Sequence, residues 1–317
     1  MLSRVADAVL WLGRYVERAE SVARFVDVNL YLELDRPDAA AAAWEPIIAT
    51  TGDSALFRAR HAVASRDAVL QFLVFDRTYA SSVVSCLGAA RENARSIREV
   101  ISLEMWEAVN RAYLDVRSAD EAAVLAAPHD FLAAVKQASH QFMGATHLTM
   151  THNEAWHFAR LGRLLERADK TSRIVDVKCF QLAPTVEGGA VPEHEIEWLA
   201  LLRSNSAFEM YRKRHRRVTP RDVVDFLLFD AEFPRSIRSC LREAESSLAA
   251  VCRAQGRRAD ARLMPVERLT SLRAGWERTQ VDDVLRSGLH ETLDTLQTRL
   301  NAVGDALYQT FVAIAPS

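Results

Sequence analysis

The 317-residue sequence predicts an all-α fold, built as a tandem duplication of one helical-bundle unit. Apolar residues recur at spacings of three and four over long stretches, which is the period of a helix face. No stretch shows the alternation of apolar and polar residues that is typical of a strand. The phrase WLGRYVERAE (11–20) also returns as RLGRLLERAD (160–169). We therefore expect two copies, residues 1–150 and 151–317, packed as one pseudo-twofold globule.

The two copies align over most of their length. Gly13 aligns with Gly162 in the repeated phrase, and FLVFD (72–76) aligns with FLLFD (226–230) at a slightly larger offset. The second copy has its extra residues in QLAPTVEGGAVPEH (181–194), which is rich in Pro and Gly, as expected of a loop between helices. If the unit is duplicated, the two copies are expected to share similar helical segments and to differ in the length of the loop between them.

Each copy is predicted to begin and to end with a helix. Ser3 is a candidate N-cap of the first helix. The closing helices are expected around residues 130–143 and 289–312. In the first helix, spacings of four and three place one apolar seam on one face: Val5, Val9, Leu12, Val16, Ala19, Ala23, Val26 and Leu30.

Further helices are expected between these ends. A long helix is predicted after Ser85, because apolar residues at helical spacing continue on one face as far as Val109. Thr219 and Pro220 predict a helix start, since Thr is a good N-cap and Pro favours the first helical position. The corresponding helix of the first copy is expected to start near Ser65. Helices of this kind pack as bundles.

Composition and charge exclude several classes of protein. The net charge of −2 argues against nucleic-acid binding, and the basic run RKRHRR (212–217) reads as a solvated face or a contact with an acidic partner. No apolar run approaches the roughly 20 residues that span a bilayer. The amphipathic N-terminus is unlike a signal peptide, so we expect a cytoplasmic protein without a membrane partner.

A polar stripe lies beside the apolar seam of the first helix. It recurs in the second copy with one change, Glu20 to Asp169, although an exposed face would be expected to diverge after duplication. We refer to these residues and the arginines beside them as the polar seam: Arg14, Glu17, Arg18, Glu20, Arg24, Asp27, Arg163, Glu166, Arg167, Asp169, Arg173 and Asp176.

One interpretation of the polar seam is structural. The first helix of each copy would pack against the other across a pseudo-twofold axis. Glu17 would then pair with Arg167, and Glu166 with Arg18, while the aligned glycines would allow the helices to approach closely. Removing one partner of such a buried pair is expected to cost about 3–5 kcal/mol.

Two other interpretations are functional. The seam could line a pocket for an anion or a peptide-like substrate, because arginine forks suit carboxylates and phosphates, with Glu17 or Glu166 as the catalytic acid or base. The second functional interpretation of the polar seam is a site for two metal ions. Glu17-x-x-Glu20 and Glu166-x-x-Asp169 resemble half of a bundle metal motif, but that motif normally has Glu-x-x-His, and the nearby arginines oppose a cation. The four histidines within 140–157 lack a metal-ligand spacing. We expect neither metal nor cofactor.

Four further residues recur as pairs. His61 and His215 each follow an arginine and are candidates for a general base or for a core or interface residue. Asp76 and Asp230 end the FLVFD and FLLFD helices, where they would cap or orient the following segment.

The sequence resembles the bacterial alpha-E family. The resemblance lies in MLSRVADAVLWLGRYVERAE at the start, in RENARSIREVISLEMWEAVN (91–110) and in the returning LGRLLERAD, and it covers nearly the whole chain. The family is named for its helices and for a recurrent Glu-Arg motif, and it typically occurs as a tandem duplication. The motif maps to Glu17-Arg18 and to Glu166-Arg167.

A second family segment, Asp-x-x-x-Pro-Arg-Ser, stands here as residues 230–236 and includes Arg235. In the first copy Ala80 and Ser81 replace its Pro and Arg, so a role for this segment would belong to the second copy alone.

The resemblance implies a context rather than a reaction. Members accompany circularly permuted ATP-grasp carboxylate-amine ligases, transglutaminase-like proteins and a proteasome-like peptidase, in a system thought to make or modify peptides. We therefore expect an accessory or substrate-presenting partner of the ligase. The alternative is an enzyme that transfers or condenses an amino-acid-like group in the polar seam.

Overall fold

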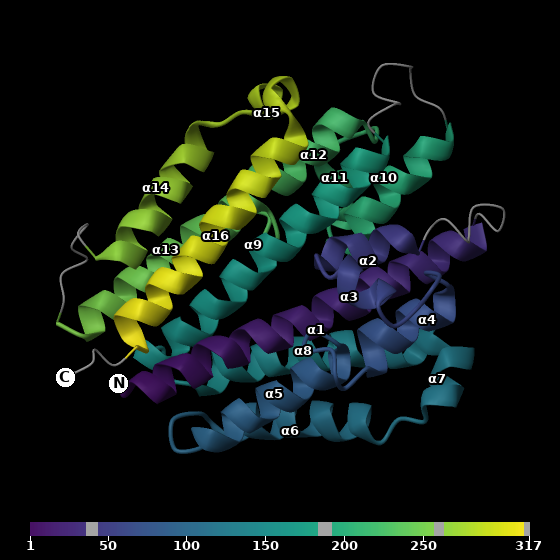
Figure 1. Cartoon of the computed structure of the whole chain (residues 1–317). Helices are drawn as coiled ribbons and strands as arrows, with labels where there is room; N and C mark the ends of the chain where they lie inside the picture. The colour runs from purple at the N-terminus through teal and green to yellow at the C-terminus, as the bar shows by residue number, and fades with distance from the viewer. Residues whose placement is uncertain (36–43, 183–191, 257–262, 314–317) are drawn as a thin grey trace.

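The computed structural model describes residues 1–35, 44–182, 192–256 and 263–313, and in these residues the chain is helical without any strand. Two long helices, α1 (Ser3–Asp35) and α9 (Glu154–Leu182), lie side by side through the middle of the molecule (Figure 1). The all-α class predicted from the sequence is confirmed. The predicted loop at 181–194 falls largely outside the described residues.

Shorter helices surround this central pair. Between α1 and α9 the chain forms α2 (Glu45–Thr51), α3 (Ser54–Arg58), α4 (Arg66–Leu70), the π-helix η2 (Gln71–Phe75), α5 (Val83–Ser96), α6 (Leu103–Arg117), α7 (Glu121–Ala126) and α8 (Pro128–Thr149). After α9 it forms α10 (Pro192–Ser204), α11 (Phe208–Arg214), α12 (Pro220–Phe229), α13 (Ile237–Ala254), α14 (Met264–Arg278), α15 (Val281–Ser287) and α16 (Leu289–Phe311).

The same set of helix contacts occurs on each side of the central pair. Helix α1 packs against α5 and α8, which also pack against α6. Helix α9 packs in the same way against α13 and α16, which also pack against α14. Figure 1 shows the first set below the α1–α9 pair and the second set above it. A duplicated unit would have this arrangement; the duplication, its boundary near residue 150 and the pseudo-twofold axis stay predictions.

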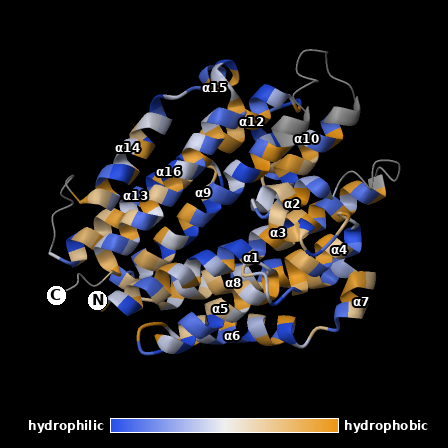
Figure 2. Ribbon diagram, in the orientation of Figure 1, coloured by the Kyte–Doolittle hydropathy of each residue, from blue (hydrophilic) through white to orange (hydrophobic). Residues whose placement is uncertain are grey.

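The hydrophobic core follows the predicted seam of α1. Every residue of that seam is buried, and Val9, Leu12, Ala23 and Val26 are completely inaccessible. Figure 2 shows hydrophobic and hydrophilic residues alternating along the helices, as expected of helices with one face in a core. No helix in the described ranges is long and apolar enough to cross a membrane.

The predicted long helix after Ser85 is wrong, because two helices replace it. Helix α5 ends at Ser96, and α6 begins after Ser102, whose hydroxyl accepts a hydrogen bond from the Met105 backbone N–H at 3.2 Å. Ile97 and Ile101 are buried in the corner between the helices. The spacing of the apolar residues therefore indicates which residues are buried, but it does not show whether they lie on one helix or on two.

Two of the three predicted helix caps are confirmed. The Thr219 hydroxyl accepts from the Asp222 N–H at 3.2 Å with Pro220 at the start of α12, and the Ser65 hydroxyl caps α4. Ser3 is instead the first residue of α1, since the carbonyl of Leu2 already accepts from the N–H of the fourth residue on.

Candidate functional site

The α1 and α9 backbones touch at the two glycines of the repeated phrase. A Cβ atom on Gly13 would lie 2.2 Å from the carbonyl oxygen of Ala159, and one on Gly162 would lie 2.1 Å from that of Leu10. Both distances are far below van der Waals contact, so only glycine fits at either position. This close approach brings the side chains one turn further along each helix within reach of the opposite helix.

The first group of buried charges, which we name the Glu17 cluster, consists of Glu17, Glu20, Arg24, Arg167 and Arg235. Arg167 donates from Nε and Nη2 to the two carboxylate oxygens of Glu17 at 2.8 and 2.7 Å. Arg235 donates to Glu17 at 3.1 Å and to Glu20 at 2.8 Å. Arg24 pairs with Glu20 inside α1. Glu17 is 1% exposed, so both of its oxygens are paired and shielded from water.

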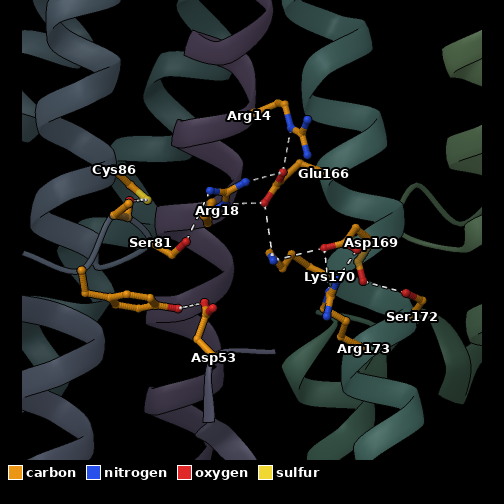
Figure 3. A network of polar contacts seen from close by, with 12 residues as sticks. Arg14, Arg18, Asp53, Ser81, Cys86, Glu166, Asp169, Lys170, Ser172 and Arg173 are labelled. Carbon is orange, nitrogen blue, oxygen red and sulfur yellow. Dashed lines mark hydrogen bonds and ion pairs between the residues drawn. The ribbon is translucent and has the colours of Figure 1, made fainter. Parts of the chain in front are cut away.

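The second group surrounds Glu166, which is fully buried (Figure 3). Arg18 donates from Nε at 2.6 Å and from Nη2 at 3.0 Å, so that it spans both oxygens of the carboxylate. Arg14 Nε donates at 2.9 Å, and Lys170 Nζ lies 3.6 Å away. We name this group the Glu166 cluster: Arg14, Arg18, Glu166, Asp169, Lys170 and Arg173.

Both cross-pairs predicted from the repeat are therefore present. Each is a bidentate contact between a motif glutamate of one helix and a motif arginine of the other, which is the strongest geometry available to an arginine and a carboxylate. Each motif glutamate is thus paired with the motif arginine of the opposite helix.

The arginines hold both glutamates in the ionised form. Burial by itself raises the pKa of Glu17, but Arg167 and Arg235 outweigh it and lower that pKa to about 2. Burial acts in the same direction on Glu166, where Lys170, Arg18 and Arg14 lower the pKa well below its usual range. A general acid or base needs a pKa near the working pH, and neither glutamate meets that condition.

The Glu17 carboxylate is expected to make stability depend on pH under acid conditions. Its folded pKa of about 2 lies below the ordinary value of 4.5, so its contribution is present above pH 4.5 and is lost as the pH falls towards 2. Urea unfolding of the wild type should show a loss of about 2 kcal/mol from this group between about pH 5 and about pH 3. Glu17→Gln should lack that part of the slope; an unchanged slope would contradict the assignment.

Each cluster also contains a cation that the other copy lacks. Arg235 lies in the segment before α13, and Ser81, its aligned residue, only accepts a hydrogen bond from Arg18 at 3.4 Å. Lys170 of the Glu166 cluster aligns with Ser21. Arg235 is a candidate that the sequence predicts, whereas Lys170 is not predicted from the sequence. No repeat marks Lys170; its only signal is the i, i+4 spacing from Glu166.

Arg163 is the predicted seam residue that joins neither cluster. It aligns with Arg14, yet it forms no ion pair in the described part of the chain, and its buried Nε has no hydrogen-bond partner. Burial and the neighbouring Arg167 lower its pKa to about 10. Arg163 contributes to the wall of a cavity of about 480 Å³, which we name the Arg163 cavity.

Two predicted seam residues tie the central helices to their neighbours instead. Asp27 of α1 bonds to His129 Nδ1 of α8 at 2.8 Å and pairs with Lys136. Asp176 of α9 bonds in the equivalent way to His290 Nδ1 of α16 at 2.8 Å. These contacts link the central pair to α8 and α16.

The recurring histidines and aspartates make contacts of their own. His61 stacks on Phe57 with ring centroids 4.9 Å apart, and His215 stacks on Tyr211 at 4.4 Å. Both imidazole rings therefore pack against a buried aromatic residue.

The aspartates that follow FLVFD and FLLFD order the next turn. Asp230 Oδ1 accepts from the backbone N–H groups of Glu232 and Phe233 at 2.8 and 2.6 Å, and it pairs with Arg214. Asp76 accepts in the same way from the Thr78 N–H at 2.8 Å. The predicted orienting role of both aspartates is confirmed.

The histidines between residues 140 and 157 interact with aromatic rings. His152 stacks on Trp156 with ring centroids 4.0 Å apart, and its Nε2 lies 3.0 Å from the His147 carbonyl oxygen. In the described ranges, no three His, Cys, Asp or Glu side chains are grouped in a way that could hold a metal ion. Figure 3 places Cys86 beside the Glu166 cluster; burial raises the pKa of its thiol to about 12, so it is not a nucleophile.

Comparison with known proteins gives one family and several relatives. A family model described as a predicted alpha-helical domain with a conserved ER motif matches residues 1–312. The chain is 24% identical to an uncharacterized protein of Mycobacterium bovis and to its equivalents in two strains of Mycobacterium tuberculosis. These matches cover 98% of this chain but 37% of each relative, so the chain spans little more than a third of their length. No solved structure matches.

Proposed function

The chain belongs to the Alpha-E family, and we propose that it is a non-catalytic, accessory component of a peptide synthesis or modification system. In this proposal it works in the cytoplasm with a circularly permuted ATP-grasp carboxylate-amine ligase. A transglutaminase-like protein and a proteasome-like peptidase are further partners. Neither nucleic acid nor a membrane takes part.

The observation that carries this proposal is that the Glu and Arg side chains of the family motif pair with each other in the interior of the protein. Both motif glutamates are buried, and each accepts a bidentate pair from the motif arginine of the other central helix. Groups paired in this way hold the fold together and are not available to a substrate. A motif that stabilises the packing of the two central helices is consistent with a protein that binds a partner through its outer surface.

The length of the relatives also supports a role that depends on another domain or protein. The matched region makes up 37% of each mycobacterial relative, so in those chains further residues are covalently linked to it. A unit that forms part of a longer polypeptide commonly works next to another domain.

The second candidate function is an enzyme that transfers or condenses an amino-acid-like group. The Arg163 cavity favours it, because a cleft of this size beside buried charges suits a small molecule. The position of the acids opposes it. Neither Glu17 nor Glu166 is among the described residues that line this cavity, and both stay ionised at neutral pH.

A co-purification experiment from the native host tests the proposal. The full chain would carry an affinity tag, and the same tag on an unrelated helical protein would serve as the control. We expect an ATP-grasp ligase in near-stoichiometric amount with the full chain and none with the control. Reconstitution should then show ATP-dependent ligation that requires the ligase and increases when this protein is added.

Two results would contradict the proposal. One is the absence of any ligase from repeated co-purifications under mild cross-linking. The other is transfer or condensation of an amino-acid-like group by this protein alone, which would support the second candidate function.

A further inference from the structure

Two arginines with the same place in the repeated phrase have different surroundings. Arg14 Nε donates to Glu166 at 2.9 Å. Arg163, its aligned residue, would be expected to donate to Glu17 in the same way, but it makes no such bond. The two phrases differ three residues before each arginine: Arg14 lies over the Trp11 ring at 4.6 Å, whereas Arg160 stands at the aligned position before Arg163.

The Glu17 carboxylate is bound by two other arginines. Arg167 already spans both oxygens, and Arg235 donates to one of them at 3.1 Å. Ser81 stands at the position aligned with Arg235, and Glu166 accepts from Arg14 and Arg18 with Lys170 Nζ 3.6 Å away. Arg163 is half-buried, forms no bond to a carboxylate in the described part of the chain and has a buried Nε without a hydrogen-bond partner.

The Arg163 cavity lies where α1, α8 and α9 meet. Gly13 of α1 contributes to the lining, and the wall includes Phe142 and Met143 of α8 and Trp156 of α9. Its volume of about 480 Å³ is within the range of small-molecule sites. The exposed side chains of His140 and His147 contribute to the lining, so the cavity reaches the surface.

The charges at this cavity are of one sign. Arg163 and Arg160 are its ionic lining residues, and the described lining contains no carboxylate. Arg160 is satisfied by Glu243 and by the Ser247 hydroxyl at 3.0 Å. Arg163 forms no ion pair in the described residues and its buried Nε has no hydrogen-bond partner, and an unsatisfied buried donor is costly. An anion that enters the cavity would remove that cost.

We propose that the Arg163 cavity binds a small organic carboxylate that carries an apolar or aromatic group. The guanidinium of Arg163 would hold the carboxylate, because its planar fork matches two carboxylate oxygens. The apolar group would lie against Phe142, Met143 and Trp156. A single unpaired arginine balances a single negative charge, which favours a carboxylate over a phosphate dianion. This inference stands apart from the proposed partnership with a ligase.

The test is an equilibrium titration of the full chain followed by tryptophan fluorescence. The probes are 3-phenylpropionate, its uncharged amide and phenyl phosphate. We expect 3-phenylpropionate to bind with a roughly millimolar Kd, as befits a fragment of this size, and the amide to bind at least about tenfold more weakly. Arg163→Gln should weaken 3-phenylpropionate by at least about tenfold as well.

Arg14→Gln is the matched control, because it changes the aligned arginine that is already paired. It should keep the affinity for 3-phenylpropionate but lower the melting temperature, whereas Arg163→Gln should leave the melting temperature unchanged or raise it. The inference is overturned if 3-phenylpropionate does not bind the wild type, if Arg163→Gln binds it equally well, or if phenyl phosphate binds more tightly.

Discussion

Glu17→Gln should lower the free energy of unfolding by about 3–5 kcal/mol, because it breaks a buried ion pair from one side only. The amide removes the negative charge that Arg167 and Arg235 share, and its NH₂ group would face one of these donors in place of an oxygen. Two buried guanidiniums would then be left without full compensation. Urea unfolding followed by circular dichroism measures the loss, and Glu166→Gln should behave in the same way.

The matched control is the same substitution at an exposed ion pair. Glu92 bonds to Arg95 at 2.8 Å, but half of its side chain is exposed, so Glu92→Gln should cost less than about 0.5 kcal/mol. The structural interpretation is wrong if Glu17→Gln melts like the wild type while activity in the reconstituted system disappears. That result would give the glutamate a chemical role that the pairing does not explain.

Gly13→Ala is expected to destabilise the protein by about 3 kcal/mol or more, since the new methyl group would overlap the α9 backbone. Its Cβ would lie 2.2 Å from the carbonyl oxygen of Ala159. A backbone oxygen cannot move aside as a flexible side chain can, so α1 and α9 must separate. That movement would also stretch the Glu17–Arg167 and Glu166–Arg18 pairs. Thermal and urea unfolding measure the effect, and Gly162→Ala should reproduce it.

Gly144→Ala is the control for this prediction. Gly144 lies within α8, and a Cβ there would meet nothing within 4 Å. Alanine has the higher helix propensity, so this variant should be as stable as the wild type or more stable by up to about 1 kcal/mol. Equal stability of Gly13→Ala and Gly144→Ala would show that the central helices do not touch as described.

Part of the site was predictable because its residues occur at aligned positions of the repeated phrase. Glu17, Arg167, Glu166 and Arg18 recur at aligned positions, and aligned positions on two packed helices face each other if the copies are related by a twofold axis. That reasoning correctly paired each glutamate with the opposite arginine. It had no means to find Lys170, which occurs in one copy only.

The remaining parts of the site depend on segments that are distant in the sequence. Arg235 bonds to Glu17 from 218 positions away. Whether it reaches Glu17 depends on how the segment before α13 folds over α9. Arg14 and Arg163 occupy aligned positions in the repeated phrase, yet Arg14 is bound to Glu166 and Arg163 lines a cavity.

The sequence by itself determined the helical class, the buried face of α1, two helix starts and the residues that meet where α1 and α9 cross. These features depend on the helical period and on hydrogen bonds over three or four residues, which are local. Only the tertiary structure decided that the chain turns a corner at residues 97–102, which cation binds each carboxylate and where a cavity remains. Those outcomes depend on distances between distant segments and on the limited number of hydrogen bonds that one carboxylate can accept.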